Sequence, residues 1–258
     1  MRLNLILFFK EFKQMTLFKV LKWSFLSVLF LILLNFLHFS FFSLLIFFLL
    51  MLKVYFSQTG ARQHFRTSFW VSNLLFVIFL AQIENLIGLK LLIFIFYGVL
   101  MFLILGLMNL FFKEKFIVYN FVNLLILLLL FSGIFAFHPL FKNFSFWQIF
   151  LWSFGIFWGV VLVLLEFWKN FGKGFLRKER FWSYLIGLLA LELSMILVFL
   201  PLGFFNAAIF LTLILLILRN VYLAYENGSL NFNFIFKELT IFVIVTALIS
   251  LLVNWRVY

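Results

Sequence analysis

The sequence predicts an all-α protein: a polytopic transmembrane helical bundle of about nine spans, with the N-terminus inside and the C-terminus outside. Of the 258 residues, 67% are hydrophobic and only 11% are charged, and the mean hydropathy is +1.25. Soluble domains average about 25% charged residues, so this chain has too little polar surface to cover a soluble globule. Apolar stretches recur along its whole length, and basic residues gather in alternate breaks between them.

We expect one transmembrane domain, 23–258, preceded by an N-terminal segment, 1–22. The basic residues of that first segment are scattered rather than gathered on one helical face, and we expect it to lie at the membrane interface or in the cytoplasm. Its apolar run ends at Lys10 and Glu11, and no small-residue cleavage site follows. We therefore interpret it as retained and not as a signal peptide.

The first apolar stretch, from Trp23 to Leu52, is too long for one span. A helix over these uncharged residues would be about 45 Å long, against a hydrocarbon core of about 30 Å. The polar break from Asn35 to Ser40 is therefore predicted to be a turn between two short spans.

Polar or charged breaks separate the later spans. The breaks are Ser57–Arg66, Glu84–Asn85, Lys113–Lys115, His138–Pro139, Lys169–Arg180, Pro201 and Arg219–Asn233. Proline ends a helix because it cannot continue the hydrogen-bond ladder. The predicted spans are 23–37, 41–56, 68–83, 88–112, 116–137, 146–168, 181–200, 202–218 and 239–253.

The distribution of basic residues supports this threading. With the N-terminus inside, only Lys90, Lys142 and Arg256 of the 20 Lys and Arg residues fall outside, and the other 17 fall inside. This agrees with the bias of basic residues toward cytoplasmic loops. Joining Trp23 to Leu52 into one span would leave about 8 inside and 12 outside, so nine spans are preferred.

Glu192 is the principal candidate for a substrate or ion site. It lies eleven residues into a predicted span, near the bilayer centre, where a charged acid costs about 2.5 to 3.5 kcal/mol. Such an acid is expected to face the bundle interior. The turn at Pro201 would bring Thr212 to nearly the same depth. The pair forms either a proton or cation site, or a polar contact that holds two helices together.

The segment from Lys169 to Arg180 is the densest cluster of positive charge. It can bind anionic lipid headgroups at the cytoplasmic face, at about 1 kcal/mol per basic residue, or serve only to set the topology. The residues concerned are Lys169, Lys173, Arg177, Lys178 and Arg180.

Other polar groups near span ends have simpler interpretations. Glu166 and Glu84 lie at span ends, where a side chain can extend to water. Asn109 and Asn120 are placed symmetrically about the Lys113–Lys115 turn and are predicted to pair across that hairpin.

The residues needed for most catalytic and metal sites are missing. The chain has no Cys and no Asp, and its three histidines show no metal-binding spacing. We therefore predict no metal, no cofactor and no catalytic residue. The net charge of +12 is explained by membrane topology and not by nucleic-acid binding.

These observations favour a multi-pass protein of the cell membrane, specifically a bacterial inner membrane. The first hypothesis is a non-catalytic membrane component: a scaffold, an assembly factor or a permease-type subunit, with the bilayer and other membrane subunits as partners. The alternative is a secondary transporter of a lipid-like or small solute with Glu192 as the coupling acid. A lipid-modifying enzyme is the least favoured class, because no recognised site is present.

Overall fold

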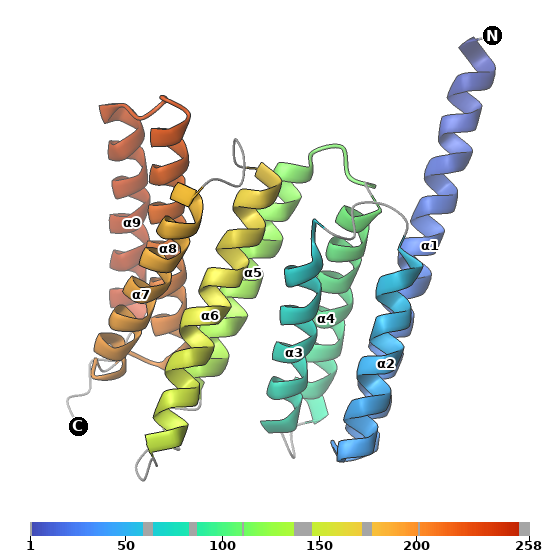
Figure 1. Cartoon of the computed structure of the whole chain (residues 1–258), viewed down its shortest axis with the longest axis horizontal. Helices are drawn as coiled ribbons and strands as arrows, with labels where there is room; N and C mark the ends of the chain where they lie inside the picture. The colour runs from blue at the N-terminus through green and yellow to red at the C-terminus, as the bar shows by residue number, and fades with distance from the viewer. Residues whose placement is uncertain are drawn as a thin grey trace. The chain divides into compact units, whose positions relative to one another are not determined.

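The computed structural model describes residues 2–58, 64–82, 87–109, 111–136, 146–171, 177–200 and 202–252. These residues form nine α-helices and no strand, which confirms the all-α class (Figure 1). The helices are α1 (Arg2–Phe36), α2 (Phe41–Ser57), α3 (Arg66–Gln82), α4 (Ile87–Met108), α5 (Lys115–Ala136), α6 (Phe146–Phe171), α7 (Arg177–Val198), α8 (Phe204–Glu226) and α9 (Phe232–Leu252).

Six of the nine helices are long and apolar enough to cross a membrane. Within the described residues these are α1, over its part Thr16–Phe36, and α4, α5, α6, α7 and α8. Helices α2 and α3 are apolar but shorter. This composition is consistent with a helical membrane protein.

The predicted break in the first apolar stretch is present. Helix α1 ends at Phe36, and His38 and Phe39 adopt positive φ angles of 54° and 52° that reverse the chain. Ser40 then caps α2, because its Oγ accepts a hydrogen bond from the Ser43 backbone N–H at 3.3 Å. Helices α1 and α2 consequently pack against each other.

Several helices extend beyond the predicted spans. Helix α1 runs without interruption through Lys22, α7 begins at Arg177 rather than 181, and α8 continues past Leu218 to Glu226. Helix α9 begins at Phe232 rather than 239. Backbone hydrogen bonds continue through charged residues, so hydropathy predicted the apolar part of each helix and not its ends.

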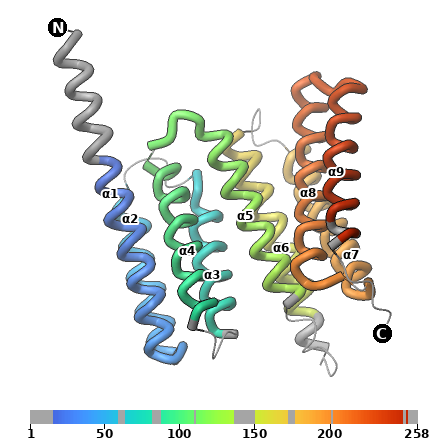
Figure 2. The backbone as a smooth tube through the Cα atoms, turned by 180° about the vertical axis from the view of Figure 1, so that it is seen from behind, coloured from blue at the N-terminus to red at the C-terminus, as the bar shows by residue number. Residues whose placement is uncertain are grey.

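The chain divides into two compact units, residues 1–123 and 124–258. In the first, α1 packs on α2, α3 and α4, and α3 packs on α4 (Figure 2). The core of this unit is aromatic and aliphatic: the ring centroids of Phe76 and Tyr97 are 4.9 Å apart. The Tyr97 hydroxyl donates a hydrogen bond to Asn73 Oδ1 at 2.5 Å, which joins α3 to α4.

In the second unit, α6 packs on α7, α7 on α8 and α8 on α9. The close contact between α6 and α7 depends on Gly187. A Cβ atom at this position would lie 2.6 Å from Val161 Cγ2 and 3.3 Å from the Phe157 carbonyl oxygen. The buried face of α7 consists of Glu179, Ser183, Ile186, Gly187, Ala190, Ser194 and Leu197.

Candidate functional site

Three charged side chains are buried among the described residues of the second unit. Glu166 lies near the C-terminal end of α6, Glu179 in the first turn of α7, and Arg219 in the last third of α8. The Arg219 guanidinium lies over the Phe167 ring, 4.3 Å from its centroid, in a cation–π arrangement. One cation and two acids are therefore enclosed among three helices that pack in series.

Aromatic rings surround this set of charges. The Tyr222 ring lies 4.9 Å from that of Trp168 and 5.0 Å from that of Trp182, between centroids. The carboxylates of Glu179 and Glu226 are close enough to act electrostatically on the Tyr222 hydroxyl. We call Glu166, Glu179, Arg219, Trp168 and Tyr222 the charged cluster. Aromatic side chains separate the charged groups of this cluster from solvent, and Coulomb interactions in such an environment are stronger than in water.

The sequence interpretation of this cluster was wrong. Glu166 was expected to reach water, but it is buried. Arg219 was assigned to a polar link after 218, but it lies inside α8 and is buried. The reason is that α8 continues for two turns past the predicted end and covers this part of α6. The sequence contains a signal that the helix continues past Leu218, because the spacing of Arg219, Tyr222 and Glu226 places all three on one helical face.

Glu192 lies on the exposed side of α7. The expectation that it faces the bundle interior is wrong. Residues Ala190 and Ser194 are on the buried face, and Glu192 lies between them, turned by about 200° from Ala190 at 100° per residue. The small residues Ser183, Gly187, Ala190 and Ser194 are typical of a helix contact face, and they could have shown that Glu192 points away.

Thr212 is buried in α8, and its Oγ1 makes no hydrogen bond within the described residues. No hydrogen bond therefore joins it to Glu192. The structure buries one member of the predicted pair and exposes the other, and whether either binds a substrate or ion stays a prediction.

The basic segment is described only at its two ends. Lys169 is exposed at the end of α6, and Arg177, Lys178 and Arg180 are exposed in the first turn of α7. Lys173 lies outside the described residues. The exposed positions leave these cations accessible to anionic groups.

The predicted pair of Asn109 and Asn120 does not form. Asn109 Nδ2 instead donates to Gln58 Oε1 at 2.5 Å, and the Asn120 Oδ1 atom has no hydrogen-bond partner within the described residues. The Asn109 contact links the end of α4 to the residue that follows α2. Sequence spacing could not show this, because it joins positions 51 residues apart.

No group of three or more His, Cys, Asp or Glu side chains that could hold a metal ion occurs in the described part of the chain. His38 and His64 are exposed. His138 and Glu84 lie outside the described residues.

The comparisons identify no relative: no family model, no curated protein and no solved structure matches this chain. The class that the fold defines is an all-helical protein with several apolar helices suited to a membrane.

Proposed function

We propose that this chain is a non-catalytic subunit of a larger complex in the cell membrane, of the bacterial inner-membrane type, and that it contacts a partner helix through α7. In this proposal the chain forms one membrane domain with nine spans, its N-terminus inside and its C-terminus outside. Its basic segment between α6 and α7 faces the cytoplasm and contacts anionic headgroups there.

The exposed face of α7 supports the proposal. Leu185, Leu188, Glu192 and Ile196 on α7 are exposed, as is Phe199, which follows the last residue of the helix. Their spacing of three or four residues makes them one continuous stripe. We call these five residues the α7 stripe. Its apolar members suit either lipid tails or another apolar helix.

The exposed position of Glu192 distinguishes contact with lipid tails from contact with another helix, and it is the single observation that carries the proposal. It lies eight residues, or about 12 Å, before the end of an apolar run at Leu200, too far for a short acidic side chain to reach the interface. Exposure to lipid at this depth costs about 2.5 to 3.5 kcal/mol. A partner helix that presents Lys, Arg or a hydrogen-bond donor opposite Glu192 removes that cost.

The test is purification of the full chain from native membranes in mild detergent, followed by identification of co-purifying proteins. We expect Glu192→Leu to leave the chain folded and inserted but to reduce partner recovery at least tenfold. Glu114→Leu is the matched control, because Glu114 is exposed outside the helices and belongs to the first unit, not to α7. Equal recovery with both variants would contradict the proposal, as would a wild-type chain that purifies alone.

The alternative is a secondary transporter of a lipid-like or small solute in which Glu192 is the coupling acid. Because Glu192 is exposed, a polar path to it would have to be completed by a second chain. Glu192→Gln separates the two functions: it keeps a hydrogen-bonding group and retains the complex in the subunit proposal, whereas coupled transport would be lost.

A further inference from the structure

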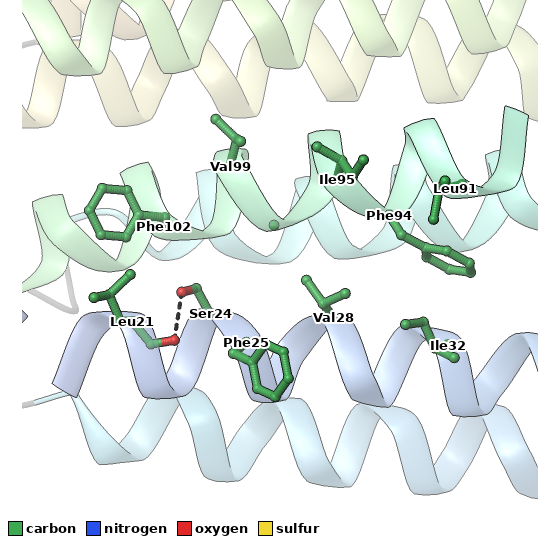
Figure 3. A pocket seen from close by; sticks show the side chains of 11 residues that line it. Leu21, Ser24, Phe25, Val28, Ile32, Leu91, Phe94, Ile95, Val99 and Phe102 are labelled. Atoms are coloured by element: carbon green, nitrogen blue, oxygen red, sulfur yellow. Dashed lines mark hydrogen bonds between the residues drawn. The ribbon is translucent and has the colours of Figure 1, made fainter. Parts of the chain in front are cut away.

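Helices α1 and α4 of the first unit enclose an apolar groove of about 540 Å³ (Figure 3). Its walls include Phe25, Val28 and Ile32 from α1, and Ile95, Val99 and Phe102 from α4. Ser24 supplies a hydroxyl, but its Oγ donates to the Leu21 carbonyl oxygen at 2.9 Å. The donor of this hydroxyl is therefore already used, and the groove offers a ligand mainly apolar contacts.

A glycine and several exposed side chains shape this groove. Gly98 lies on its α4 wall, where an added Cβ would be 3.0 Å from Val28 Cγ2, so the absence of a side chain keeps the two helices close. Phe25, Ile95 and Val99 are at least half exposed. The groove is therefore open along its side to the surrounding medium, as a site that is filled from the bilayer must be.

The length of the groove matches one leaflet. On α1 it extends from Leu21 to Ile32, which is about 16 Å along the helix axis. The hydrocarbon core of a bilayer is about 30 Å thick, so the groove covers roughly the acyl region of a single leaflet. Figure 3 shows Leu21 and Phe102 at one end of it and Ile32 and Leu91 at the other.

Positive charge is placed at the Leu21–Phe102 end. Lys22 follows Leu21 and is exposed. The Phe102 ring centroid lies 6.2 Å from that of Phe112, which brings the exposed Lys113 to the same end. Glu114 and Lys115 come next, so the run 113–115 keeps a net positive charge. At the opposite end Lys90 precedes Leu91 and is less exposed.

We propose that this groove binds one acyl chain of an anionic phospholipid, with the lipid phosphate beside Lys22 and Lys113. The apolar walls select a hydrocarbon chain, the length assigns it to one leaflet, and the two exposed lysines select a negative headgroup. The site uses α1, α4 and the segment that follows α4, and no residue of the α7 stripe contributes to it.

Native mass spectrometry of the purified full chain, titrated with phosphatidylglycerol or with phosphatidylcholine of the same acyl chains, tests the headgroup preference. We expect one phosphatidylglycerol molecule to be retained preferentially. Lys22→Gln and Lys113→Gln should each lower that preference about fivefold. Both lysines are exposed, so the variants should fold. Equal retention of the two lipids by the wild type would overturn the proposal.

The groove itself is tested with Gly98→Leu, which places a side chain between α1 and α4. Its control is Gly155→Leu, because Gly155 is exposed and nothing lies within 4 Å of an added Cβ there. Loss of the retained lipid in the Gly98 variant alone supports the groove. Equal lipid retention by the Gly98 and Gly155 variants would overturn the assignment of the groove as the lipid site. Cross-linking of Phe25 or Ile95 to another protein chain, and not to lipid, would also overturn it.

Discussion

A buried charge in an apolar helix bundle is stable only where other polar groups share its environment. Arg219 shares the second unit with two buried acids, Glu166 and Glu179, and its guanidinium lies over the Phe167 ring. The cluster joins α6, α7 and α8. It is thus a structural element of the second unit, and Arg219 is the cation that it buries among the described residues.

Arg219→Met tests this dependence. Because both carboxylates stay buried, we expect a loss of about 3 to 5 kcal/mol of stability, measured as a lower midpoint of thermal unfolding in detergent. Lys178→Met is the control, since Lys178 is exposed at the start of α7, and it should change the midpoint little. The triple change of Arg219→Met with Glu166→Gln and Glu179→Gln should recover part of the loss. Equal midpoints for the two single variants would refute the role of the cluster.

At the scale of elements, α6 and α7 approach each other closely at Gly187, which carries no side chain. An added Cβ would meet a backbone oxygen, the Phe157 carbonyl at 3.3 Å, as well as Val161. A side chain can rotate away from such a contact, but a helix backbone cannot. The distance between these two helices therefore depends on this one position.

Gly187→Ala should accordingly destabilise the protein by about 1 to 3 kcal/mol. Gly155→Ala lies in open space and should be neutral or stabilising by up to about 1 kcal/mol, because Ala favours the helix. Gly159→Ala should fall between them, since its added Cβ would meet only the flexible end of Leu130. Chemical denaturation in a common detergent measures the order. A Gly187 variant as stable as the Gly155 variant would disprove the close-contact argument.

At the scale of the whole molecule, the odd number of proposed spans requires the two termini to lie on opposite sides of the membrane. All but three of the 20 basic residues then lie toward the cytoplasmic side of the membrane, in agreement with the positive-inside bias. Helix α1 and helix α2 are joined by a tight turn, and this turn sets the direction of every later helix in the threading.

A reporter fused after Tyr258 tests the threading. Alkaline phosphatase placed there should be active, because it folds outside the cytoplasm, while a fluorescent protein that matures only in the cytoplasm should stay dark. A second fusion, within the turn 113–115, should give the opposite pair of signals. A cytoplasmic C-terminus would exclude the nine-span arrangement.

The sequence by itself determined the properties that depend on local chemistry. Apolar runs of 15 or more residues predicted the helices, and the polar break before Phe41 predicted the first turn, because hydropathy and backbone geometry act within one segment. The sequence also identified Glu192 as a residue with a high free-energy cost in lipid, since that free energy depends on how deep the residue lies along its own helix.

Only the tertiary structure decided which way the polar side chains face. Glu192 is exposed while Glu166 and Arg219 are buried. A side chain is buried only if neighbouring helices cover the face of the helix on which it lies, and the sequence of one helix does not show which face is covered. The end of α8 illustrates the reason. Its last two turns begin at Arg219 and Asn220 and end at Glu226, yet they are helical and contact the end of α6 through Tyr222 and Trp168. Burial here is set by contacts between segments far apart in the chain.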